Sequence, residues 1–148
     1  MSLQQRLSDE IKSAMLARDA DRLGTLRLLK SALGYAQIEK KTEATSDPDF
    51  VALVQREIKK RRDSFEQFEK AGRGELAAKE KQEIGVLEAF LPPALSEADL
   101  EQLVRNTIQE LGATGKKEMG QVIKAVQAKA AGRAEGKTIS GLVGKLLP

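Results

Sequence analysis

Apolar side chains recur at steps of three and four residues through almost the whole sequence, and this spacing is the strongest constraint on the fold. Residues at such steps lie on one side of an α-helix, where another element can bury them. Ala, Leu, Lys, Glu and Arg are abundant and only four residues are proline, which agrees with helix nearly everywhere. We expect an all-α protein.

The segment Phe90-Leu91-Pro92-Pro93 interrupts the helical pattern and divides the chain. Neither proline can donate a backbone hydrogen bond, and Pro93 disfavours the helical conformation at Pro92. The 148 residues suffice for one ordinary domain or two small ones. We therefore expect two domains, residues 1–93 and residues 94–148.

Residues 1–93 predict about four helices that pair as two helical hairpins. Ser2 can cap the first helix and Asp19 or Asp21 the second, because their side-chain oxygens can accept hydrogen bonds from first-turn amides. Ser46 opens a long third helix, with a proline two residues later in the first turn. The connections are short, so neighbouring helices are expected to run antiparallel.

The third of these helices carries an apolar seam that a charged residue interrupts. Arg61 occupies the seam position between Ile58 and Phe65. It belongs to the basic run 59–62, which could touch RNA but has members on every side of the helix. We interpret that run as a solvated face with Arg61 snorkelling. The seam itself consists of Val51, Val54, Ile58, Phe65 and Phe68.

Residues 94–148 predict a small bundle of three helices. Ser96 caps the first, and Gly112 can end it in a left-handed conformation. The stretch 116–148 then reads as a helical hairpin. In its turn, Gly132 is the expected left-handed cap and Gly136 is a second place where the backbone can reverse.

Positive charge is concentrated in this last hairpin. Residues 116–148 hold seven Lys and Arg against Glu118 and Glu135, whereas residues 94–115 hold four acids against Arg105. A local cationic surface attracts phosphate backbones through counterion release, without sequence information of its own. The alternative is that these lysines only solvate helix faces.

The absence of cysteine and histidine excludes several classes of function. Disulfides, thiolate nucleophiles, imidazole bases and ordinary zinc or haem sites all need one of these residues. No DxDxD-like cluster suggests a magnesium site, so we expect neither metal nor cofactor. Without a signal-like segment or an apolar run long enough to span a bilayer, a soluble cytoplasmic protein is expected.

Several groups of residues resemble the GatB/YqeY family, and the resemblance covers the whole chain. That family joins the C-terminal tail of GatB, a component of the glutamine-dependent aminoacyl-tRNA amidotransferase, with free-standing YqeY-like proteins. In the hairpin, the matching residues are Met119-Gly120-x-Val122-Ile123-Lys124, Gly132-Arg133-Ala134-Glu135-Gly136-Lys137, Ser140, Val143, Leu146 and Leu147. Before it, they are Thr25-Leu26-Arg27-Leu28, Glu57-Ile58-Lys59-Lys60-Arg61 and Phe90-Leu91-Pro92.

The resemblance implies a larger helical N-terminal part, a small tail-like C-terminal domain and a tRNA-binding accessory function. The tail of the amidotransferase contacts tRNA, and here the basic hairpin would supply the contacts. The second domain has no aromatic residue on which bases could stack, so we expect phosphate and shape recognition of structured RNA. The expected RNA-binding residues are Lys116, Lys117, Lys124, Gly132, Arg133, Gly136 and Lys137. For the two glycines, simple turn geometry is an equal explanation.

Two other functions stay open from the sequence. The N-terminal hairpins, through the interrupted seam, could dock on an aminoacyl-tRNA synthetase, an amidotransferase or another translation-related enzyme. The family's association with carbon–nitrogen ligation, with glutamine as amide donor, suggests an enzyme. The sequence contains no match to the amidase or ATP-dependent catalytic signatures, however, and we assign no catalytic residue. No membrane partner is expected.

Overall fold

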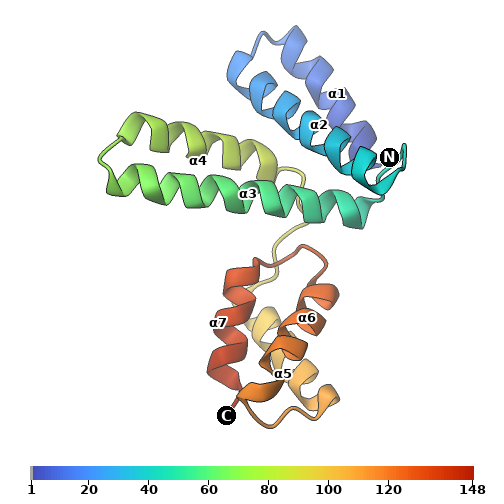
Figure 1. The fold of residues 1–148 in the computed structure, drawn as a ribbon, viewed down its shortest axis with the longest axis vertical. Coiled ribbons are helices and arrows are strands. Elements are labelled where there is room, and N and C mark those ends of the chain that lie inside the picture. Colours follow the sequence, from blue (N-terminus) through green and yellow to red (C-terminus); the bar gives the residue numbers. More distant parts are fainter. Residues whose placement is uncertain (1) are drawn as a thin grey trace. The chain divides into compact units, whose positions relative to one another are not determined.

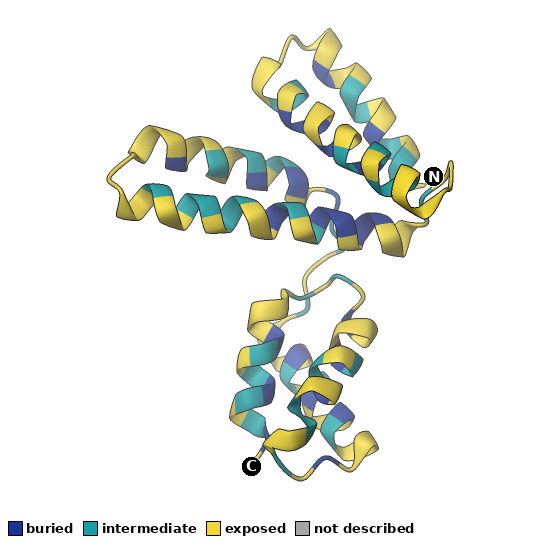
Figure 2. Ribbon diagram, viewed as in Figure 1, coloured by how far each residue is buried: buried dark blue, intermediate teal, exposed yellow. Residues whose placement is uncertain are grey.

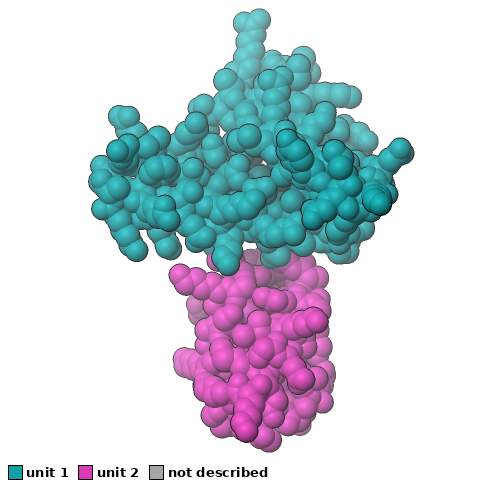
Figure 3. All heavy atoms as spheres, viewed as in Figure 1, with its two compact units in different colours: residues 1–91 teal, residues 92–148 magenta. Residues whose placement is uncertain are grey.

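The computed structural model describes residues 2–148, and over that range the secondary structure is entirely helical (Figure 1). The α-helices are α1 (Leu3–Leu16), α2 (Ala20–Lys40), α3 (Asp47–Lys70), α4 (Gly74–Glu88), α5 (Glu97–Leu111), α6 (Met119–Ala130) and α7 (Gly136–Leu146), and a single 3₁₀ turn, η1 (Lys116–Glu118), precedes α6. The predicted all-α fold is confirmed. The chain separates into two compact units, residues 1–91 and residues 92–148, which Figure 3 distinguishes by colour.

The N-terminal unit consists of two helical hairpins, α1–α2 and α3–α4. Their starts are set by the side-chain caps that the sequence predicts. The hydroxyl of Ser2 accepts from the amide of Gln5, and that of Ser46 accepts from the amide of Asp49. At α2 the carboxylate of Asp19 accepts from Arg22 N at 3.2 Å, which decides between the two aspartates considered.

The core of this unit lies where all four helices meet, and α2 packs on both α3 and α4 (Figure 2). Phe90, from the segment expected only to end a helix, is fully buried in it. Its ring centroid lies 5.7 Å from that of Phe50, and the Arg6 guanidinium carbon lies 4.9 Å from its centroid. The buried core residues are Leu7, Ala14, Leu26, Leu29, Leu33, Phe50, Leu53, Val54, Ile58, Ile84, Leu87 and Phe90.

Arg61 is not a snorkelling surface residue, and that prediction was wrong. Its side chain is only 13% exposed, and Nε donates to Glu83 Oε2 of α4 at 3.0 Å. Nη1 also donates to Glu57 Oε2 at 3.4 Å. The error arose because α4 packs along α3 and brings an acid from 22 residues away to meet the charge.

The apolar seam of α3 is covered from within the chain. Val51, Val54 and Ile58 are buried, and Phe65 and Phe68 are half-buried, because α4 lies along α3. The part of the seam from Val51 to Ile58 is therefore buried within the chain, while Phe65 and Phe68 keep part of their surface exposed.

Glu80 of α4 lies beside the Arg61 ion pairs. Burial raises the pKa of the Glu80 carboxyl, and the charge of Glu83 raises it further, while Arg61 and Lys79 act in the opposite direction. Among the residues that the structure describes, no group donates a hydrogen bond to its buried Oε2 atom. Folding therefore favours the protonated carboxyl.

The C-terminal unit is a bundle of α5, α6 and α7, each of which packs on the other two. Ser96 Oγ accepts from Asp99 N at 3.1 Å and caps α5, and Gly112 ends that helix with a φ of 63°. The buried core residues are Leu100, Val104, Ala113, Val122, Val126, Ala130, Ile139, Val143 and Leu147.

We predict that Arg61→Ala destabilises the N-terminal unit by about 2 to 3 kcal/mol, because it leaves Glu57 and Glu83 close together without their cation. Lys60→Ala, which removes an exposed ammonium 3.9 Å from the same Glu57, should cost less than about 0.5 kcal/mol. Urea unfolding followed by circular dichroism measures both free energies. Equal losses of unfolding free energy for the two variants would contradict the conclusion that the Arg61 ion pairs stabilise this unit.

We predict that Glu80→Gln stabilises the same unit at neutral pH. Because the pKa of Glu80 is higher in the folded than in the unfolded chain, its contribution to stability falls as pH rises above the ordinary glutamate value of about 4.3. Gln copies the uncharged form, so the gain in Tm over the natural chain should be absent in acid and grow towards neutral pH.

Glu75→Gln is the control for this experiment. Glu75 is exposed in the first turn of α4, where its negative charge favours the helix dipole, so its neutralisation should lower Tm slightly. A Glu80→Gln effect that does not change with pH would contradict the predicted linkage.

Candidate nucleic-acid interface

Helices α6 and α7 pack on each other and run antiparallel, with small residues of α7 at the contact. A Cβ atom added at Gly136 would lie 3.3 Å from Nε2 of Gln127, near the end of α6. One added at Gly144 would lie 3.4 Å from Cε of Met119, at the start of α6. Gly136, Ser140 and Gly144 are four residues apart and form the row that meets α6.

Four exposed lysines lie on η1, α6 and α7. Lys124 is one turn before Gln127 on α6, and Lys137 directly follows Gly136 on α7, so both border the close contact. Lys117 lies in η1, seven residues before Lys124, and Lys145 lies eight residues after Lys137 on α7. We call this set, Lys117, Lys124, Lys137 and Lys145, the cationic face.

The four lysine side chains of the cationic face are exposed. Within residues 2–148 none of them forms an ion pair with a carboxylate. The buried residues of α6 and α7 lie on the other sides of these helices, against α5. The cationic face is therefore turned to solvent and away from α5.

Lys129 shows by contrast which side of α6 faces α5. Its ammonium pairs with Glu110 of α5 and lies 3.4 Å from Thr107 Oγ1. This lysine is five residues from Lys124 on the same helix, yet its charge is neutralised within the bundle. The acid of α5 thus neutralises a lysine only on the side of the hairpin that faces α5.

Lys116 and Arg133, two of the predicted contact residues, are held by backbone carbonyls. Lys116 Nζ donates to the carbonyl oxygen of Gly144 and joins η1 to the end of α7. Arg133 Nε donates to Pro93 O at 2.9 Å, and Leu95 N donates to Arg133 O at 2.8 Å. Because a carbonyl is neutral, these contacts leave the positive charges uncompensated, but both side chains also join segments of the unit.

Gly132 is left-handed as expected, but Gly136 is not the turning point that the sequence suggested. The left-handed cap of α6 is Ala131, with a φ of 48°, and Gly132 follows it with a φ of 84°. Gly136 is not a turning point but the first residue of α7, with Glu135 in extended conformation before it. The turn therefore needs two consecutive left-handed residues, and Gly136 provides room for Gln127 instead.

The predicted residues form a strip along the unit and not one cluster. Lys116 and Lys117 lie at the start of α6, whereas Gly132, Arg133 and Gly136 lie beyond its end. The 12 residues of α6 separate these groups by about 18 Å. Lys124 and Lys137 occupy the region between Lys117 and the turn.

Sequence reasoning missed Lys145 and the role of two exposed glycines. Gly120 on α6 and Gly141 on α7 have nothing within 4 Å of an added Cβ, so packing within the chain does not require them. Glycine inside a helix costs about 1 kcal/mol relative to alanine. Gly141 lies midway between Lys137 and Lys145, four residues from each. This spacing was the signal that could have identified Lys145 and Gly141 from the sequence.

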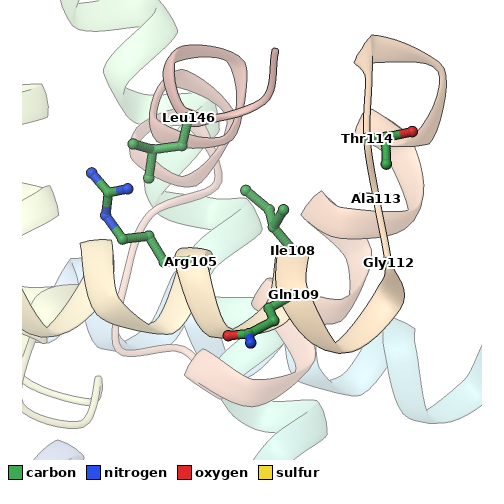
Figure 4. Close-up of a pocket in the computed structure, with 7 residues that line it drawn as sticks. All are labelled: Arg105, Ile108, Gln109, Gly112, Ala113, Thr114 and Leu146. Atoms are coloured by element: carbon green, nitrogen blue, oxygen red, sulfur yellow. The ribbon is translucent and has the colours of Figure 1, made fainter.

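A shallow hollow lies elsewhere on the C-terminal unit, between the end of α5 and the end of α7 (Figure 4). It has a volume of about 300 Å³, with Ile108 and Leu146 on its apolar side. The Arg105 guanidinium at its edge is already paired with Glu101 at 2.8 Å. Neutralised in this way, it gives the hollow little charge for binding an anion.

The described residues contain no group of three or more acidic side chains placed to hold a metal ion. None of the helices in the part of the chain that the structure describes has the length and apolarity of a membrane span.

Comparison with known proteins identifies the family to which this chain belongs. The profile of the family described as Yqey-like protein matches residues 4–147. Altered inheritance of mitochondria protein 41, mitochondrial, of Pyrenophora tritici-repentis is 30% identical over 131 residues, which cover 87% of this chain and 71% of that protein. Uncharacterized protein C22F3.15 of Schizosaccharomyces pombe is 36% identical over 91 residues, which cover 62% of this chain and 73% of that protein. The chain belongs to the YqeY-like family.

Proposed function

We propose that the cationic face binds structured RNA, with tRNA as the physiological ligand. The observation that carries this proposal is the set of four exposed lysines without carboxylate partners on η1, α6 and α7. Phosphates would replace water and counterions around these ammonium groups.

The geometry favours an RNA duplex or folded stem over single-stranded RNA. The C-terminal unit contains no Phe, Tyr or Trp, so bases have no aromatic side chain on which to stack. At Gly120 and Gly141 the absence of a Cβ would let a sugar–phosphate backbone approach the helices closely. Recognition would depend on shape and phosphate position.

The choice of tRNA rests on resemblance. Residues 116–148 resemble the tail of GatB, and that tail contacts tRNA. The cytoplasm, where the sequence leads us to expect this chain, contains a large pool of tRNA. The Pyrenophora relative is named as a mitochondrial protein, and mitochondria contain tRNA as well.

We predict that Lys124→Ala weakens binding to bulk tRNA several-fold and makes the slope of log K against log salt shallower by about 0.9, the value of one phosphate contact. Fluorescence anisotropy at several salt concentrations measures both quantities. Lys129→Ala is the matched control, since it removes the same side chain from the same helix at a position paired with Glu110. It should leave the slope unchanged.

A second comparison in the same assay tests the class of RNA. A hairpin stem should bind more tightly than an unstructured polyuridine of equal length. If Lys129→Ala reduces affinity as much as Lys124→Ala, or polyuridine binds better than the stem, the cationic face is not the RNA site.

A further inference from the structure

Helix α2 of the N-terminal unit carries an exposed apolar stripe that the RNA-binding proposal does not use. Leu28 is 54% exposed, Tyr35 is 75% exposed and Ile38 is 76% exposed. They are spaced by seven and three residues, so they lie on one side of the helix. The opposite side of α2 supplies Leu26, Leu29 and Leu33 to the core.

The stripe is interrupted by small residues that create hollows between its large side chains. Ser31 lies between Leu28 and Tyr35, and Gly24 precedes Leu28 by one turn. An added Cβ at Gly24 or Gly34 would meet nothing within 4 Å, so packing within the chain does not require these glycines. Large side chains separated by hollows resemble the surface that one helix presents to another.

One long edge of the stripe is cationic. Arg27 and Lys30 are exposed along it, and neither forms an ion pair in the part of the chain that the structure describes. Glu39 lies at the other edge. A partner that buries the apolar residues would therefore bring its own flank against Arg27 and Lys30, and an acidic flank is complementary.

A second copy of this chain fits the stripe poorly. In an antiparallel two-fold pairing, the same edge of each α2 meets its equivalent, so the two cationic edges would lie against each other. In a parallel two-fold pairing, the cationic edge would face the edge with Asp21 and Glu39, but each acid would lie about 9 Å or more along the axis from Arg27 and Lys30, since at least six residues separate them. Neither arrangement neutralises the cationic edge.

We propose that this face of α2 is a docking site for an amphipathic helix of another protein, with an apolar ridge against Leu28, Tyr35 and Ile38 and an acidic flank against Arg27 and Lys30. This mode is helix against helix, with anchors spaced by helical turns. The surface is separate from the cationic face, so either site can fail without the other.

Tyr35 provides a specific probe of this surface. It is the one tyrosine in the sequence and there is no tryptophan, so intrinsic fluorescence of the full chain reports on α2 alone. A helical peptide of about 14 residues, spanning about 21 Å, covers the stripe. The acidic probe carries Leu on one side and Glu elsewhere, and its matched counterpart carries Lys in place of Glu. Both lack Tyr and Trp.

We expect saturable binding of the acidic peptide, about tenfold tighter than that of the basic peptide. Leu28→Gln with Ile38→Gln should weaken the acidic peptide by about tenfold or more, because it removes two apolar anchors and keeps the reporter. Leu16→Gln, at an 86% exposed position at the end of α1, is the control and should change nothing. Arg27→Glu with Lys30→Glu should reverse the preference, a gain that misfolding cannot produce.

Four results would overturn the proposal. The two peptides could bind equally well, or neither could perturb Tyr35. Anionic lipid vesicles or a single-stranded oligonucleotide could give the saturable change while the acidic peptide gives none, which would assign the stripe to a membrane or to RNA. Sedimentation could show a dimer that Leu28→Gln with Ile38→Gln dissociates, which would make a second copy the occupant.

Discussion

The close approach of α6 and α7 is the contact on which the C-terminal unit depends. Gly136 and Gly144 leave room for Gln127 and Met119, at distances that a larger side chain would occupy. Ser140, between them, donates its hydroxyl to the carbonyl of Gly136 at 2.9 Å and so needs no outside partner. Because the two helices meet along this small row, the lysines that border it come to one surface.

The same packing separates charge by sign. On the inner side, Lys129 reaches Glu110 of α5, while on the outer side Lys124 has no acid to pair with. The hairpin therefore presents the cationic excess visible in its sequence to solvent. A unit of 57 residues with one acidic helix and one cationic face can orient itself toward a polyanion before contact.

The sequence predicts those features that neighbouring residues decide. Ser46 and Ser96 cap their helices because the cap and its amide lie three residues apart, and Gly112 ends α5 for an equally local reason. The all-α fold follows from apolar spacing in the same way. Of the candidate site, the exposure of Lys124 and Lys137 could be expected from their positions opposite the apolar residues.

The features that the sequence does not predict depend on residues brought together by tertiary packing. Helical spacing puts Arg61 in the apolar seam of α3 but does not show that α4 supplies Glu83 to it, and Phe90 follows a helix yet packs its ring on Phe50. Arg133 is an expected RNA contact, but its bond to Pro93 cannot be seen in the sequence, because 40 residues separate the two. Helical spacing predicts the side of the helix on which each residue lies, but it does not predict which distant residue that side chain contacts.

If RNA meets the outer side of α6 and α7, amide chemical-shift mapping will detect the contact most directly. In ¹⁵N-labelled protein titrated with an RNA hairpin stem, we expect the shifted amides to be those of Gly120, Lys124 and Gly141, with α5 unchanged. Shifts concentrated on α5, or no shifts in the C-terminal unit at a concentration where the stem is bound, would contradict this mode of binding.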